Sequence, residues 1–119
     1  MHLILAVAAL AAWGQDPQPE SQQPTSLAQF QSNGSTVLAV GGTALTTTVV
    51  LSGIVNGTVD PTPPRHALQV EIRPANEPLT GTMTHQAATL VTVGQTSTVT
   101  VAGLSPGVAY HWQARTWKT

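Results

Sequence analysis

Short runs in which apolar and polar residues alternate dominate the chain from about Leu27 to Thr119, and Gly, Pro and Asn separate them. Alternation with a period of two places successive side chains on opposite faces of a β-strand. No stretch shows the spacing of an amphipathic helix. The pattern therefore predicts one all-β, antiparallel domain over residues 27–119.

The first predicted strands lie in "STVLAV" (35–40), which the turn signal "GGT" follows, and in "TTTVVLSGIV" (46–55). In the second run Val49, Leu51 and Val55 share one face. Gly53 interrupts that stripe, and a glycine inside a strand often marks a bulge or a close approach of another backbone. Three prolines then predict a loop over "NGTVDPTPP" (56–64), because proline cannot donate to a strand ladder.

The clearest alternation is in "HALQVEIRP" (66–74), which places Leu68, Val70 and Ile72 on one face and Gln69, Glu71 and Arg73 on the other. A loop follows it, with a short edge strand expected around Thr80 to Thr84.

Two further runs, "AATLVTV" (87–93) and "STVTVAGL" (97–104), flank "GQT" and predict a hairpin, with Val99 and Val101 facing inward. The final strand, "AYHWQARTW" (109–117), directs Tyr110, Trp112 and Ala114 to the predicted core.

A proline-glycine turn joins the last two runs. Leu104, Pro106, Gly107 and Tyr110 form the pattern LxPGxxY. A tyrosine at the start of such a strand can bury its ring while its hydroxyl bonds to backbone a few residues upstream, as in the tyrosine corner of Greek-key sandwiches. These residues are therefore predicted to fix the crossover between two sheets.

The stretch "VTVAGLSPGVAYHWQAR" resembles the E to F region of fibronectin type III domains. Upstream, "STVLAVGGTALTTTVVLSG" and "LQVEIRP" are similar to the A, B and C strands of such modules in bacterial surface and secreted proteins. The resemblance covers roughly Ser26 to Thr119. It implies an immunoglobulin-like β-sandwich that acts as a spacer or adhesion unit and has no active site.

The chain departs from this family in two ways. The family commonly has a tryptophan on strand B, where this chain has none, so we expect Trp112 to fill the core. The family also needs a seventh strand, G, beside F, and this sequence ends at "TWKT". The predicted sandwich therefore lacks its last strand. Either the sequence is a fragment, or a strand from another chain or from Leu3 to Ala12 completes the sheet.

The N-terminal residues 1–14 predict a signal peptide. The apolar run from Leu3 to Trp13 is shorter than a bilayer span, so no stable membrane span is expected. The small residues Ala12 and Gly14 occupy the minus three and minus one positions of the predicted cut before Gln15. No Lys or Arg precedes the run, and a short buried strand or helix is the alternative. Residues 15–26, rich in Pro and Gln, predict a disordered linker.

Charge and cysteine content limit the partners and the chemistry. The net charge is -1 and 8 % of residues are charged, which argues against nucleic acid as a partner. The chain has no cysteine, so packing alone must hold a secreted form together.

No catalytic, metal or cofactor site is predicted. His66, His85 and His111 lack the spacing of metal ligands, and a single Asp60 near Asn56 offers too few oxygens for calcium. The chain has no GxSxG motif and no evident pair of catalytic carboxylates. Trp117 falls on the strand face opposite Trp112, where an exposed ring suits stacking on a sugar or contact with a partner.

The sequence thus predicts a secreted or surface-exposed, non-catalytic module, part of a larger multidomain protein, that serves as a spacer or adhesion unit. Its partners are expected to be neighbouring domains, a surface protein or a polysaccharide, with strand donation from another chain as a further mode. The alternative is a carbohydrate-binding accessory module of an extracellular hydrolase, with Trp117 as its contact residue.

Overall fold

The computed structural model describes residues 3–7, 23–57 and 64–119 of the 119-residue chain. These residues form strands and no helix. In chain order the strands are β1 (Leu3–Val7), β2 (Thr25–Phe30), β3 (Gly42–Ala44), β4 (Val49–Ile54), β5 (His66–Pro74), β6 (His85–Gln86), β7 (Thr96–Val101) and β8 (Ala109–Lys118). Accordingly, the described part of the chain contains no helix that could cross a membrane.

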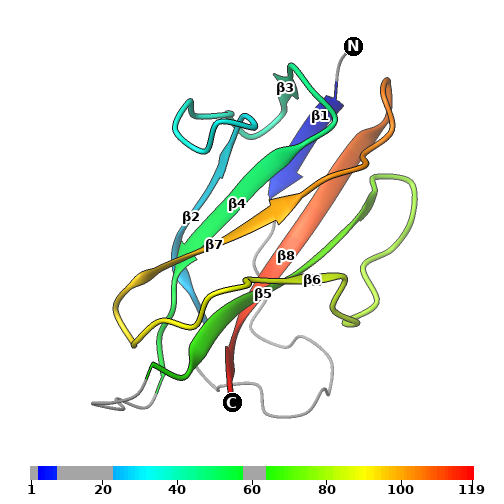
Figure 1. Cartoon of the computed structure of the whole chain (residues 1–119). Coiled ribbons are helices and arrows are strands. Elements are labelled where there is room, and N and C mark those ends of the chain that lie inside the picture. The colour runs from blue at the N-terminus through cyan, green and yellow to red at the C-terminus, as the bar shows by residue number, and fades with distance from the viewer. Residues whose placement is uncertain (1–2, 8–22, 58–63) are drawn as a thin grey trace.

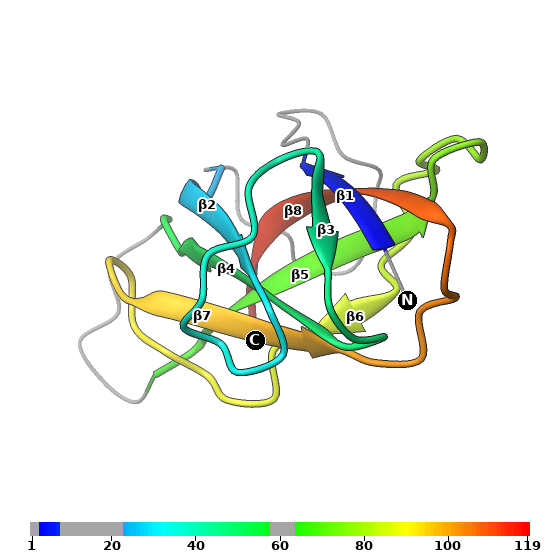
Figure 2. The same ribbon diagram turned by 90° about the horizontal axis from the view of Figure 1, so that it is seen from above.

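The strands form two sheets that pack face to face, as in a β-sandwich (Figures 1 and 2). One sheet has the order β3-β1-β8-β5-β6 and the other the order β2-β4-β7. Neighbouring strands are antiparallel, except that β1 runs parallel to β8. The antiparallel all-β prediction is therefore confirmed for the body of the domain.

Side chains from both sheets form one apolar core. Trp112, Leu51 and Leu68 are the largest apolar side chains that are fully buried in it. The predicted inward sets are confirmed: Val49, Leu51, Val55, Leu68, Val70, Ile72, Val99, Val101, Tyr110, Trp112 and Ala114 are all buried. Alternation along β7 is equally clear, because Thr98 and Thr100 are exposed.

The strand predicted over residues 35–40 is wrong, since only Val37 pairs there, in an isolated bridge with Phe30. Asn33 explains the difference. Its Oδ1 accepts hydrogen bonds from the backbone N–H groups of Ser35 and Thr36, both at 2.9 Å. Such local bonds compete with a strand ladder. The chain instead forms β2 before this turn and β3 over Gly42–Ala44, which includes the last two residues of the predicted turn "GGT".

The hairpin predicted over residues 87–104 is also wrong in its first half. Residues 87–93 do not pair with β7. They contact β5 through Ala87 N–H to Leu68 O at 3.0 Å and Val91 N–H to His66 O at 2.7 Å. The edge strand expected at residues 80–84 forms slightly later, as β6.

Strand β1 occupies the place where the sequence predicts a missing strand. Leu3–Val7 lies between β3 and β8, with Leu5 opposite Tyr110 and Val7 opposite Trp112 (Figure 1). Of the sources considered, the N-terminal segment fills this position in the structure. The predicted cut before Gln15 lies outside the described residues and stays a prediction.

The domain begins earlier than residue 27. Thr25 and Ser26, assigned to the predicted linker, belong to β2, and Pro24 is buried. The rest of the predicted linker, apart from Gln23, lies outside the described residues, as do residues 58–63 of the predicted proline-rich loop.

Gly53 lies on β4 opposite a bulge in β2, whose register shifts between Thr25 and Ala28. A Cβ atom on Gly53 would lie 2.7 Å from Leu27 Cδ2 and 3.3 Å from Leu68 Cδ1. The glycine thus meets both a bulge in the partner strand and a close approach. The approaching atoms belong to side chains and not to a backbone.

Replacing Gly53 with valine should lower the free energy of unfolding by about 1–3 kcal/mol, because the new side chain overpacks the core beside Leu27 and Leu68. Urea unfolding of the full chain measures this change. The matched control, Thr98→Val on the exposed face of β7, should stay within about 0.5 kcal/mol of the wild type. Equal stability of the two variants would contradict the packing role of Gly53.

Candidate functional site

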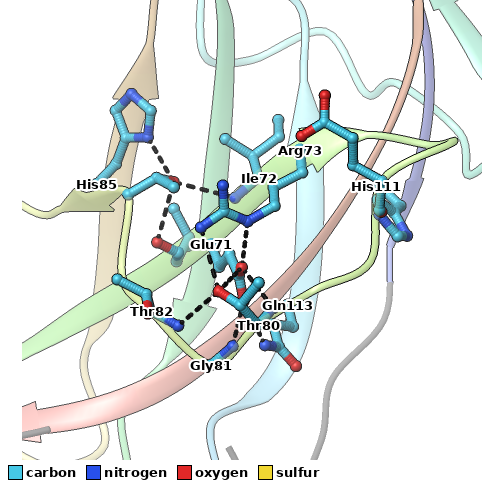
Figure 3. Close-up of polar contacts among 12 residues, drawn as sticks. Glu71, Ile72, Arg73, Thr80, Gly81, Thr82, His85, His111 and Gln113 are labelled. Carbon is cyan, nitrogen blue, oxygen red and sulfur yellow. Dashed lines mark hydrogen bonds and ion pairs between the residues drawn. The ribbon is translucent and has the colours of Figure 1, made fainter. Parts of the chain in front are cut away.

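The most elaborate polar arrangement lies on the face of β5 that points away from the core. Gln69, Glu71 and Arg73 alternate with the core residues of β5, as predicted. Their burial was not predicted: Gln69 is only 4 % exposed and Glu71 is 0 % exposed. Figure 3 shows Glu71 at the centre of this cluster.

Five donors surround the Glu71 carboxylate. Its Oε2 accepts hydrogen bonds from the Thr80 N–H at 2.7 Å and the Thr80 hydroxyl at 2.9 Å, and it forms an ion pair with the Arg73 guanidinium. Its Oε1 accepts from the Gly81 N–H at 2.9 Å and from Gln113 Nε2 at 2.8 Å (Figure 3). One buried anion therefore joins β5, β8 and the loop of residues 75–84.

These donors determine the charge state of Glu71. Burial of the carboxylate raises its pKa. The hydrogen bonds from the Thr80 and Gly81 backbone, the Thr80 hydroxyl and Arg73 outweigh burial, and lower the pKa to about 2. A carboxylate with so low a pKa is a weak base at neutral pH, because it binds a proton poorly. The geometry suits Glu71 to hold the loop and not to transfer protons.

Both ends of the loop are also fastened to the sheet. At its start, the Ala75 N–H donates to Ala109 O at 2.7 Å, and His111 Nε2 lies 2.7 Å from Glu77 O. At its end, the Thr84 N–H donates to Val70 O at 2.9 Å. Between these anchors Asn76, Glu77, Pro78, Thr82 and Met83 are exposed. The arrangement presents a fixed loop to solvent.

A second polar chain continues along the same face of the sheet. Gln69 Oε1 accepts a hydrogen bond from Arg115 Nε at 2.7 Å, and Gln69 Nε2 donates to Gln86 Oε1 at 2.7 Å. These hydrogen-bonded side chains extend from β8 across β5 to β6. Arg115 is only 5 % exposed, so its charge is held within the fold and is not displayed as a basic surface.

The predicted corner residues come together as expected. The Tyr110 hydroxyl accepts a hydrogen bond from the Ser105 N–H at 2.8 Å, which is the upstream backbone contact predicted for it. Leu104 is buried, Pro106 is exposed, and Gly107 has a φ of +75°, a backbone conformation that favours glycine at this turn.

Trp112 fills the core, as predicted, and is 0 % exposed. Its Nε1–H donates to Gln29 Oε1 at 2.9 Å, so the ring also joins β8 to β2 in the opposite sheet. Trp117, the predicted contact residue, lies near the end of β8 opposite Ala67 of β5. Its ring is half-buried and packs against the core cluster, so it is less available to a ligand than the sequence suggested.

The three histidines considered as metal ligands lie on three different strands. His66 is buried on β5, His85 is half-buried on β6, and His111 on β8 contacts the loop backbone. Burial lowers the pKa of His85. Among the described residues no group of three or more His, Cys, Asp or Glu side chains could hold a metal ion. Asp60 lies outside these residues, and Asn56 Nδ2 donates to Gln23 O at 2.9 Å.

Little in the sequence points to the Glu71 cluster. Its strand pattern, "QVEIR", is that of any half-exposed strand, and the donors come from "TG" at Thr80 and Gly81 in a loop without periodicity. Comparison of the chain with protein families, with curated proteins and with solved structures gave no match. The geometry of the residues is therefore the basis for proposing a function.

Acid should destabilise the wild type partly through Glu71. The folded pKa, about 2, lies below the ordinary value of 4.5, so the carboxylate stabilises the fold above about pH 5 and this contribution disappears as the pH falls toward 2. The shift corresponds to at most about 3 kcal/mol. We expect Glu71→Gln to lose stability of this order at pH 7, with a difference from the wild type that narrows on acidification.

Urea unfolding at a series of pH values between 2 and 7 measures this effect. Glu77→Gln is the matched control, because Glu77 is exposed in the same loop and should leave the pH profile unchanged. A constant difference between Glu71→Gln and the wild type across this range would show that the charge of Glu71 does not hold the loop.

Proposed function

We propose that this chain is a secreted or surface-exposed, non-catalytic module of the fibronectin type III kind, which serves as a spacer or adhesion unit of a larger multidomain protein. The observation that carries the adhesion role is the loop of residues 75–84. One buried carboxylate holds the loop in place and both of its ends are fastened to the sheet, while its outward residues stay exposed.

The strand order supports the family part of the proposal. In an immunoglobulin-like sandwich, strands A, B and E form one sheet, and C, F and G lie in the other. Strands β2, β4 and β7 match A, B and E in order, and β5 and β8 match C and F. Strand β1 takes the place of G, although it runs parallel to β8. The Tyr110 corner lies between the strands that match E and F.

The placement of the loops supports a contact role. The start of β2 and the end of β8 lie at one end of the sandwich, where Asn56 bonds both Gln23 and Thr116. The loop leaves β5 after Pro74, which pairs with Tyr110 at the start of β8. It therefore emerges at the opposite end from Thr119 (Figure 1). Rigid scaffolds commonly place recognition residues on such loops.

Carbohydrate binding through Trp117 is the less supported alternative, because the ring is half-buried against the core. Sugar stacking needs an accessible aromatic face. Because Trp117 is partly exposed, substitution of this residue can test carbohydrate binding directly.

Beads coated with the full chain test the contact role on a panel of immobilised polysaccharides and glycoproteins. If the loop is the contact surface, Glu77→Ala combined with Met83→Ala should reduce bead retention at least fivefold, since both side chains are exposed there. The control pair Thr98→Ala and Thr100→Ala, exposed on β7, should retain the wild-type value.

Unchanged retention of the loop variant would contradict a contact role for the loop. Selective loss of polysaccharide retention in Trp117→Ala would favour the carbohydrate-binding alternative. No retention on any surface would oppose adhesion and leave the spacer role.

Secretion has its own test. Export of the full chain from a bacterial host, followed by intact-mass measurement, should give a product that begins at Gln15, because Ala12 and Gly14 fit the small-residue preference of signal peptidase. A product that retains Met1 in the exported fraction would contradict the signal peptide.

A further inference from the structure

Strand β1 lies in a position that is one strand wide. Its register places Ile4 opposite Ala109 of β8 on one side and opposite Thr43 of β3 on the other. Neighbouring strands lie about 4.8 Å apart, so β3 and β8 are separated by two such spacings, about 9.6 Å. We call the space between Ala109–Trp112 and Gly42–Ala44 the strand slot.

Each wall of the strand slot also has contacts that do not involve β1. Strand β8 pairs with β5 along its whole length, from His66 opposite Lys118 to Pro74 opposite Tyr110. Side-chain and turn contacts hold β3: Gln31 Nε2 donates to Thr43 O at 3.2 Å, and Gln31 Oε1 accepts from the Leu45 N–H at 2.9 Å. Removal of β1 would therefore leave a preformed slot.

An open slot would be costly. The backbone groups of Ala109–Trp112 on that edge would lose their ladder partners. Tyr110 and Trp112, both of which are buried, lie on this stretch of β8, so the slot borders the core. The slot therefore favours an extended occupant that supplies backbone hydrogen bonds and apolar side chains at alternate positions.

Strand β1 is connected to the rest of the domain only through a long segment of the chain. Seventeen residues, 8–24, separate it from β2, which is far longer than a two- to five-residue hairpin loop. It pairs with only the first part of β8, and the chain has no cysteine to lock it. The cut proposed before Gln15 would separate it from the domain altogether.

We propose that the strand slot is a binding site for a short, uncharged peptide strand from another protein, which takes the place of Leu3–Val7 in the mature module. This inference rests on the proposed signal peptide. The occupant that fits is seen in β1 itself: "LILAV", extended and parallel to β8. Edge-to-edge pairing of two copies through β8 does not fit, because β3 closes the far side of the slot.

The experiment uses the full chain with residues 16–22 replaced by a site for a sequence-specific protease. The purified protein is cut and mixed with a fluorescent peptide of residues 1–12 that carries two added lysines for solubility. We expect the peptide to displace the cut segment and to co-elute with a monomeric, folded domain, with saturable binding by fluorescence anisotropy.

Peptide variants test the register. Leu5→Asp places a carboxylate opposite the buried Tyr110 and should weaken binding at least tenfold. Ala6→Asp, the matched control, places it opposite the half-buried His111 and should weaken binding less than threefold.

A peptide with an activated disulfide on a cysteine at position 6 should crosslink to His111→Cys protein at least tenfold faster than to Thr98→Cys protein. Thr98 lies on β7 in the other sheet, so it should not be reached.

Several results would overturn the proposal: no peptide uptake, equal crosslinking at residues 98 and 111, unfolding after the cut, or closure of the slot by dimerisation without peptide. The added protease makes the cut independently of export. A failure of peptide binding therefore rejects the strand slot and does not bear on the signal peptide, which the mass measurement tests. Retention of Met1 on export rejects the signal peptide and does not alter the peptide binding measured here.

Discussion

The pairing of β5 with β8 is the interaction on which the rest of the structure depends. These two strands are paired from His66 opposite Lys118 to Pro74 opposite Tyr110, and they are buried on both faces over most of that length. One face supplies Leu68, Val70 and Trp112 to the core. The other carries Glu71, Gln113 and Arg115, so a shift of the pairing by one residue would put charged groups into the core. The register therefore fixes the core and the polar cluster together.

On the polar face of this sheet, one of the few charged residues of the chain, Glu71, orders a loop. Of the described carboxylates, Glu71 is fully buried and its oxygens are occupied by donors from β5, β8 and the loop of residues 75–84. A buried charge costs stability unless it is paired and hydrogen-bonded. Its donors must therefore lie at defined positions, whereas an apolar contact tolerates more variation in geometry. The ordering of an otherwise irregular loop follows from that requirement, and the proposed contact role follows from the ordering.

Sequence periodicity located the strands that direct one apolar face to the core. The alternation in β4, β5, β7 and β8 is strong because the core selects apolar residues at every second position, and the tyrosine corner followed from residue types that a turn requires. Sequence periodicity failed to predict the structure of segments in which local hydrogen bonds, or a position at the edge of the sheet, determine the conformation. Asn33 folds residues 33–36 into a turn, and Ala87 and Val91 bond to β5 in place of β7. The burial of Glu71 depends on Thr80 and Gly81, which lie nine and ten residues away in a segment without a pattern.

The N-terminal segment shows why composition alone could not assign a single role. A short run of Leu, Ile, Val and Ala suits both the apolar part of a signal peptide and a central strand, because both environments exclude water. A strand that joins its sheet across a long connection closes a larger loop than a hairpin strand and pays more entropy for it. The β5–β8 pair, the Tyr110 corner and the Gln31 contacts do not involve Leu3–Val7. The proposed exchange of that segment follows from this separation.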